Sequence, residues 1–523
     1  MQSDDQGPSG QSSDPSPTTA EVASLGVAEL RRRFEAGETS SVEVVNRLLE
    51  RIEAVDRNGP KLRSVLAVAD DALETAAQLD QERANGRVRS PLHGIPVLVK
   101  DNIDTAGGAL TTAGSLALAT GRPAADAWVI RQLRSAGAVV LGKTNLSEWA
   151  NFRSEHSSSG WSGCGGQTRN PYVLDRSPSG SSSGSGVAVA AGLAPLALGT
   201  ETDGSILSPA SVSGVVGIKP TVGRVSRGGV VPISSTQDTV GPMARSVADA
   251  AELLEVISGP DPADAATRVR RGGRFELARP LSAAGLKGMR LGVARSEFFG
   301  HSSAMDRLVE EALAVLADAG AVLVDPANIP TSTALRESRD EFTVLLTEFK
   351  VGVEAYLRAR HATDPSVPES LAELIRFNSD HAEQELPWFG QDIFVEAEKT
   401  SGLQDPAYRR ARARGLRRSR AQGIDAALIE HRVSALLVPT NSPAWSIDLV
   451  NGDSSSTAYG PRIAALAGYP AITLPLGLVS GLPVGISLIG AAWEERHLIE
   501  VAAAVETTLQ VAIRPAFLAE VEP

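Results

Sequence analysis

Short apolar runs recur along most of this chain, and they constrain its fold more than any other feature. Between about Leu92 and Ile257 they alternate with helical or glycine-rich segments, and further runs return much later in the sequence. The clearest are IPVLV (95–99), AVVLG (138–142), MRLGVA (289–294), AVLVDP (321–326), SALLVPT (434–440) and AITLPLG (471–477). Short apolar runs of this kind are typical of buried strands. The pattern predicts an α/β fold with one large sheet built from distant parts of the chain, rather than several separate domains.

Two regions carry helical patterns. Near the start, VAELRRRFEAG (27–37) predicts a short helix that ends at Gly37, and the pair Ser40 and Glu43 predicts the capped start of a second helix. The region of about 333–430 is predicted to be a helical insertion, because apolar residues there recur on one face. These residues are Leu345, Phe349, Val353 and Tyr356.

Residues 1–24 are rich in Ser, Pro, Gly and Asp and are predicted to form a disordered polar tail ahead of a folded domain at 25–518. This start lacks the basic residues and the apolar middle of a signal peptide. Such a tail is also compatible with an export signal absent from this chain, so both a cytoplasmic and an exported location stay open. Since no run of about 18 apolar residues occurs, we expect no membrane span.

The charge balance bears on possible partners. The net charge is −12, which disfavours binding to nucleic acid through phosphate contacts. The basic segment YRRARARGLRRSR (408–420) contains one aromatic residue, Tyr408, and is interpreted as a solvated helix rather than a nucleic-acid site. With one cysteine, Cys164, and no histidines at zinc-ligand spacing, we expect no disulfide, no metal and no cofactor.

Two short motifs match known catalytic patterns in their letters only. GAVVLGKT (137–144) fits the phosphate-loop pattern, but its middle residues Ala138 to Leu141 favour a buried strand over a phosphate-binding turn. GSSSG (180–184) fits the nucleophile elbow of α/β hydrolases, but no apolar strand precedes it. Neither nucleotide hydrolysis nor an elbow-type triad is therefore predicted.

A longer stretch gives the decisive motif. The segment GSSSGSGVAVAAGLAPLALGTETDGSILSPASVSGVVGIKPT (180–221) resembles the signature region of the amidase signature family. Further blocks fit the same family: GIPVLVKDN (94–102), TTAGS (111–115), GKTNLSEWA (142–150), GPMARSV (241–247) and GYPAITLPLG with GLPVGISLIG (468–490). The resemblance covers most of the chain and implies one domain with a signature core at about 90–260. It also implies a single large mixed sheet covered by helices on both faces.

Amide hydrolysis needs a nucleophile, a proton acceptor and donors for the oxyanion. With no well-placed histidine, a lysine becomes the candidate base, and burial of Lys100 at the end of an apolar run would lower its pKa. The resemblance implies that Lys100 is the catalytic lysine, Ser205 the acylated nucleophile and Ser181 the bridging serine, with a cis Gly180–Ser181 peptide bond. By the same resemblance, the backbone amides of Thr202, Asp203 and Gly204 form the oxyanion hole.

Five positions depart from the family pattern, and two of them, Ser183 and Ser185, replace a glycine and an acid in the first loop. The usual Gly-Gly before the nucleophile is Asp203-Gly204, the usual aspartate is Glu201, and the usual arginine is Leu207. These departures cast doubt on an assignment to the A-type subunits of tRNA-dependent amidotransferases. The blocks TETDGSI, GSSSGSGVAVA and NLSEWANFRS are instead similar to bacterial peptide amidases, which hydrolyse the C-terminal amide of peptides and release ammonia.

Two other functions stay open on the sequence: an acylamidase for aryl or fatty amides, and an A-type amidotransferase subunit. We expect a small-molecule or peptide amide as substrate and no nucleic acid as partner. Either a monomer or a homodimer is compatible with the sequence.

Overall fold

The computed structural model describes residues 18–268, 285–454 and 460–521. Its centre is one eleven-stranded sheet with the strand order β1-β3-β2-β6-β8-β7-β12-β13-β11-β9-β10. The strands are β1 Val65–Val68, β2 Pro96–Lys100, β3 Val139–Thr144, β6 Leu196–Glu201, β7 Val216–Lys219, β8 Thr239–Ala244, β9 Arg290–Val293, β10 Val322–Val324, β11 Ala435–Pro439, β12 Ala471–Val479 and β13 Leu482–Ile489. A short hairpin of β4 Trp161–Ser162 and β5 Gly166–Gln167 lies apart from it.

The sheet is mixed. β2 runs parallel to β3 and β6, and β9 runs parallel to β10 and β11, whereas the other neighbouring pairs are antiparallel. All six apolar runs singled out in the sequence lie in strands of this one sheet, so the α/β prediction is confirmed. The phosphate-loop letters of GAVVLGKT fall largely on β3, as their β-branched middle predicts.

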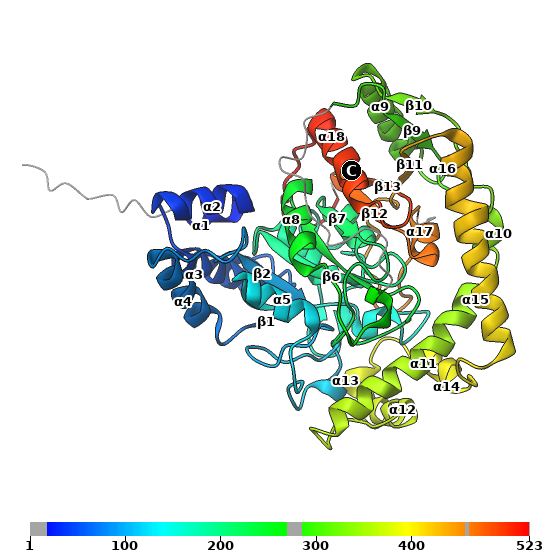
Figure 1. Cartoon of the computed structure of the whole chain (residues 1–523). Coiled ribbons are helices and arrows are strands. Elements are labelled where there is room, and N and C mark those ends of the chain that lie inside the picture. Colours follow the sequence, from blue (N-terminus) through cyan, green and yellow to red (C-terminus); the bar gives the residue numbers. More distant parts are fainter. Residues whose placement is uncertain (1–17, 269–284, 455–459, 522–523) are drawn as a thin grey trace, which may run out of the picture.

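Helices cover both faces of the sheet (Figure 1). α6 Ser183–Ala190 and α7 Leu207–Val212 contact each other and pack on β2, β6, β7 and β12. α4 Ala72–Ala84, α5 Trp128–Ala136, α8 Val247–Ile257, α9 Ser303–Asp318 and α18 Glu495–Leu509 form a second group that packs on β3, β8 and β12. α6 is buried almost throughout, which its small side chains permit.

The N-terminal helices include one that the sequence did not predict. α2 Val27–Ala36 ends at Gly37 with φ 68°, and Ser40 accepts a hydrogen bond from the Glu43 amide at the start of α3 Ser41–Arg51, both as expected. The predicted tail at 1–24 is wrong for its last part, because Thr19–Ser24 forms α1. Thr18 and Glu21 form a capping box there, and Val22 is buried in the core. Residues 1–17 lie outside the described residues.

The predicted helical region at 333–430 is also helical in the structure. It contains α10 Ser332–Arg336, α11 Asp340–His361, α12 Leu371–Asp380, α13 Ala382–Glu385, α14 Asp392–Glu398, α15 Pro406–Ser419 and α16 Asp425–His431, followed later by α17 Arg462–Ala467. Figure 1 shows α11, α12 and α14 at the lower right of the molecule and α15 along its right edge. Phe349 and Val353 of α11 are wholly buried in a cluster with Trp149 and Phe394.

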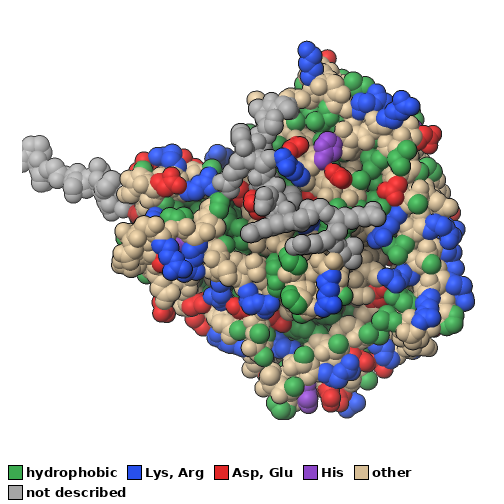
Figure 2. Space-filling model, viewed as in Figure 1, with side chains coloured by type: hydrophobic (Ala, Val, Ile, Leu, Met, Phe, Trp, Pro, Cys, Tyr) green, Lys and Arg blue, Asp and Glu red, His purple; other side chains and the backbone are tan. Residues whose placement is uncertain are grey.

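The arginine-rich segment forms α15. Lys and Arg side chains gather along the edge of the molecule where α15 lies (Figure 2). Arg414 makes a two-point ion pair with Asp340 of α11, with nitrogen–oxygen distances of 2.6 and 2.9 Å. This arrangement agrees with the prediction of a basic helix partnered by acidic surface. Among the described residues, no helix has both the length and the apolar composition that crossing a bilayer requires.

Candidate active site

The first part of the site is set by two parallel strands. β2 and β6 are neighbours in the sheet, with Val99 opposite Leu198, so their carboxyl ends meet at the same edge. Lys100 is the last residue of β2, and Thr200 lies near the end of β6. The strand pairing thus brings together two side chains that are one hundred residues apart in sequence.

Lys100 is completely buried and well supplied with hydrogen-bond acceptors. Its Nζ lies 2.7 Å from Ser181 Oγ, 2.8 Å from Thr200 Oγ1 and 3.3 Å from the Thr200 carbonyl oxygen. Burial lowers the pKa of Lys100 well below its usual range, and the nearby carboxylates of Glu201 and Asp238 oppose this shift only in part. The environment therefore favours a neutral amine that can accept a proton.

The serine-rich segment SPSGSSSGSG (177–186) forms a packed turn that leads into α6. The Gly180–Ser181 peptide bond is cis, as the family resemblance implied. A Cβ at Gly180 would lie 2.2 Å from Ser147 Oγ, and one at Gly184 would lie 2.3 Å from the Ser64 carbonyl oxygen. Glycine is needed at both positions because neighbouring groups approach the chain so closely.

The other serines of this stretch have structural partners. Ser182 Oγ donates to the Thr200 carbonyl, Ser183 Oγ to the Ser179 carbonyl and Ser185 Oγ to the Leu198 carbonyl. All three side chains are buried. They hold the turn and α6 against β6.

Ser181 and Ser205 line one cleft together with Asn102, Thr200 and Thr202. Ser205 is largely buried in this cleft but keeps 8% of its surface exposed. The amide of Ser182 donates to the Ser205 carbonyl oxygen at 3.1 Å, which ties the two serine segments to each other. Lys100 lies behind Ser181, on the buried side of the cleft.

The turn between β6 and α7 contains the proposed oxyanion amides. Gly204 has φ 89°, a conformation that favours glycine. Glu201, where the family has aspartate, accepts hydrogen bonds from the amides of Ile206 and Leu207 at 2.8 and 3.0 Å. It therefore fixes the start of α7, on which the position of Ser205 depends.

Asp203 belongs to a cluster of charged groups behind this turn. Arg462 at the start of α17 lies 3.7 Å from Asp203 and makes two hydrogen bonds to Glu341 of α11. Burial and the neighbouring Glu341 raise the pKa of Asp203 well above its usual range. The side-chain amide of Gln237 links the cluster to the turn by donating to Glu341 and to the Thr202 carbonyl.

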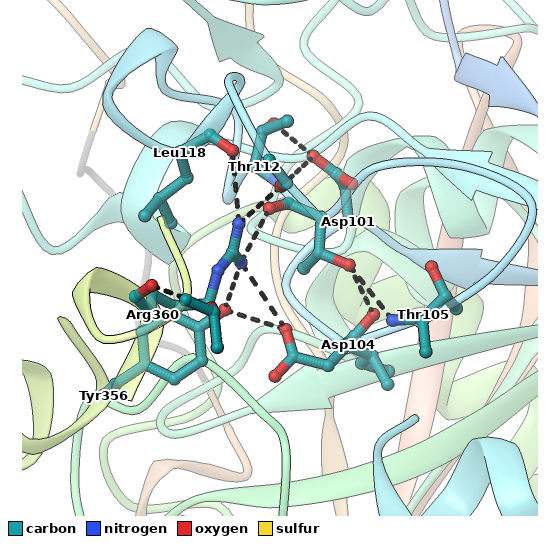
Figure 3. A network of polar contacts seen from close by, with 12 residues as sticks. Asp101, Asp104, Thr105, Thr112, Leu118, Tyr356 and Arg360 are labelled. Carbon is teal, nitrogen blue, oxygen red and sulfur yellow. Dashed lines mark hydrogen bonds and ion pairs between the residues drawn. The ribbon is translucent and has the colours of Figure 1, made fainter. Parts of the chain in front are cut away.

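The loop that follows Lys100 is held by a buried polar network (Figure 3). Asp101 accepts hydrogen bonds from the amide and hydroxyl of Thr112. Arg360 of α11 donates to the carbonyl oxygens of Thr111, Leu118 and Gly121. Its guanidinium also lies 3.9 Å from Asp104, which accepts a hydrogen bond from Tyr356 at 2.8 Å. Burial raises the pKa of Asp104 to about 6.

Sequence reasoning missed three residues that shape the cleft. Thr200 contacts the lysine directly, and Asn102 donates to the Thr200 hydroxyl at 3.0 Å. Asp238 accepts a hydrogen bond from Thr202 at 2.6 Å and so holds the turn before Ser205. Thr200 and Asn102 both lie inside blocks that resemble the amidase signature family. Their place in those blocks is the sequence signal that could have identified them. Among the described residues, no group of three or more His, Cys, Asp or Glu side chains is placed to hold a metal ion.

A family model described as Amidase matches residues 43–499. The chain is 39% identical over 513 residues to a probable amidase of Arabidopsis thaliana, a match that covers 96% of this chain and 93% of that protein. It is 37% identical to the A-type subunit of the glutamyl-tRNA(Gln) amidotransferase of Symbiobacterium thermophilum, over 95% of this chain and 99% of that one. This chain belongs to the amidase signature family and is a hydrolase that acts on amide C–N bonds.

Within the family, a solved structure gives a finer comparison. The structure of native peptide amidase from Stenotrophomonas maltophilia matches with a TM-score of 0.88 and 51% sequence identity. The match covers 95% of this chain and 99% of that one. The fold predicted from the signature blocks is therefore confirmed.

Proposed function

We propose that this amidase uses Ser205 as nucleophile, Ser181 as proton relay and neutral Lys100 as proton acceptor. Ser205 Oγ attacks the carbon of a carboxamide and passes its proton to Ser181, which passes its own to Lys100 Nζ. Amides of Thr202, Asp203 and Gly204 bind the oxyanion. The C–N bond then breaks, and the proton returns by the same route to the departing ammonia.

The second half of the reaction removes the acyl group. A water molecule takes the place of ammonia and loses a proton to Lys100 by way of Ser181. Its oxygen attacks the acyl carbon, and the bond to Ser205 Oγ breaks as that oxygen regains its proton. The products are a carboxylic acid and a free enzyme in its starting protonation state.

One observation carries this proposal: the Nζ of a completely buried lysine lies 2.7 Å from the hydroxyl of Ser181, which shares a cleft with Ser205. Burial lowers the pKa of Lys100 well below its usual range, which favours the neutral amine that the base role requires. Thr200 supports the same role, because its hydroxyl and carbonyl oxygens orient the amine toward Ser181.

The substrate we propose is the C-terminal amide of a peptide. The 51% identity to the peptide amidase of Stenotrophomonas maltophilia favours it over the two alternatives. An acylamidase for aryl or fatty amides would use the same three residues and differ in the substrate it accepts. The match to an A-type amidotransferase subunit keeps a tRNA-linked role as the lower-ranked alternative.

The test measures ammonia release from a peptide amide by the purified protein and by three variants. Ser205→Ala removes the nucleophile and is expected to lower kcat by at least about 1,000-fold. Ser181→Ala and Lys100→Ala break the relay and are expected to be severely impaired. Ser185→Ala is the matched control, because its hydroxyl contacts the Leu198 carbonyl and lies outside the cleft lining.

Full activity in all three relay variants would overturn the mechanism. The substrate class is tested in parallel with a peptide amide, an anilide and a long-chain amide. A preference for the anilide or the long-chain amide would favour the acylamidase alternative.

A further inference from the structure

A second cavity adjoins the catalytic cleft. Its volume is about 280 Å³, and it shares Arg227, Val230 and Asp238 with the cleft that contains Ser181 and Ser205. The rest of its wall comes from the segment around Pro232 and from α11 and the chain near Leu403. A cavity of this size is too small for a drug-sized ligand but large enough for one bulky side chain or a short acyl group.

The charged side chains in the wall are already engaged with the protein. Arg227 makes a two-point ion pair with Asp264 at 2.7 and 2.9 Å. Asp238 accepts hydrogen bonds from Thr202 and from the amides of Ile233 and Ser234.

Glu348 is engaged in the same way. It accepts hydrogen bonds from Ser234 and from the Tyr408 hydroxyl, both at 2.6 Å. The wall therefore contains three carboxylates and one guanidinium, and each of these four groups has a partner in the chain. What the wall offers to a ligand is mainly its apolar surface.

That apolar surface is open to solvent at the mouth. Val230, Pro232 and Ala263 contribute apolar surface to the wall, as do Val351 and Leu403, which keep 38% and 37% of their surfaces exposed. Large apolar side chains that stay exposed around a concave site next to reactive groups are typical of ligand-binding surfaces.

Because the leaving group of the proposed reaction is ammonia, every substituent of the substrate lies on the acyl side of the scissile bond. Ser181 and Lys100 return the proton to departing ammonia, so the leaving group lies beside Ser181 in the proposed mechanism. The cavity instead joins the cleft through Asp238, whose carboxylate holds Thr202 in the turn with the proposed oxyanion amides. Beyond the apolar residues of the cleft itself, Ala150, Val231 and Ile233, a substituent that extends past Asp238 has the apolar wall of this cavity available to it.

We propose that this cavity is a specificity site that binds an uncharged apolar group on the acyl part of the substrate, such as a leucine side chain. The inference rests on the proposed function and deepens it. With three carboxylates against one guanidinium, the wall disfavours an acidic side chain. Val351 and Leu403 are the specificity-determining residues, since they border the entrance and form no part of the relay.

The experiment compares N-acetyl-leucinamide with N-acetylglycinamide as substrates for the wild-type protein and three variants. Val351→Glu and Leu403→Glu place a carboxylate at the mouth of the cavity from two separate segments. Val395→Glu is the control, because Val395 has 39% exposure on α14 and lies outside the cavity lining.

We expect the first two variants to lower kcat/KM for N-acetyl-leucinamide by roughly 10-fold. With N-acetylglycinamide the same variants should stay within about two-fold of wild type, and Val395→Glu should behave as wild type with both substrates. Equal losses for both substrates, or no loss for either, would overturn the inference while leaving amide hydrolysis intact. No ammonia release by the wild-type protein from either amide would overturn the proposed function and this inference with it.

Discussion

Lys219 illustrates how a single buried ammonium group affects the stability of this fold. It ends β7, is completely buried, and donates to the Pro220 carbonyl oxygen at 3.0 Å. Burial lowers its pKa to about 8, although Glu201 and Glu495 favour the charged form. Lys100 has the same kind of environment, but there the proposed chemistry requires the lowered pKa.

Replacing Lys219 by methionine is expected to stabilise the protein at neutral pH. The pKa falls from 10.5 to about 8 on folding, which corresponds to about 3 kcal/mol. Below pH 8 the amine is protonated in both the folded and the unfolded state. The folded state is then destabilised by the full free-energy cost of burying the charged amine. As pH rises from 8 to 10.5 the cost disappears, because the amine becomes neutral in both states. Urea unfolding at pH 7 and at pH 10 measures the difference.

The expected gain for Lys219→Met is up to about 3 kcal/mol at pH 7 and much smaller at pH 10. Lys399→Met serves as control, since Lys399 is exposed and should show no comparable dependence on pH. A gain of equal size at both pH values would show that lost charge is not its cause.

At the scale of elements, α11 is joined to the loop after Lys100 by Tyr356, which donates to Asp104, and above all by Arg360. Arg360 is 3% exposed. Its guanidinium donates hydrogen bonds to three carbonyl oxygens of that loop and forms an ion pair with the Asp104 carboxylate. Removing it leaves these acceptors buried without their donor. Arg360→Met is therefore expected to lower the free energy of unfolding by about 3–5 kcal/mol, as measured by urea denaturation.

A matched control comes from the same helix. Arg358 has a side chain that is 53% exposed and pairs with Glu354 at 3.6 Å on the surface. Arg358→Met should change the free energy of unfolding by no more than about 0.5 kcal/mol. If the two variants had the same stability, the network in Figure 3 would not hold the loop.

Sequence patterns predicted some elements well and others poorly, for physical reasons. β2, β3 and β11 are continuous apolar runs, because both faces of these strands are buried, and such runs stand out in a sequence. β7 and β8 are also buried, but VGIK and TVGPMA are short or broken by glycine and proline, so no strong run marks them. α1 was missed because a polar composition hid a capping box and one buried valine.

At the scale of the whole molecule, the sheet brings the proposed catalytic groups together from distant segments. Lys100 and Ser181 are 81 residues apart in sequence, yet Nζ and Oγ are in hydrogen-bond contact. Motifs identified Lys100, Ser181 and Ser205, since each lies in a distinctive local pattern. Asp238 and Arg227 were not found, because their roles arise from contacts with Thr202 and Asp264 that no local pattern encodes.

The same arrangement predicts that this chain works alone. Lys100, Ser181, Ser205 and the turn with the proposed oxyanion amides all come from one sheet and the helices packed on it. We therefore expect the purified protein to release ammonia from a peptide amide without tRNA and without other protein chains. The measurement is ammonia release by the purified chain, repeated after addition of tRNA, with Ser205→Ala as the blank. Activity that appears only with tRNA or a partner protein would contradict this expectation and favour the amidotransferase alternative, because one chain would then lack part of the working site.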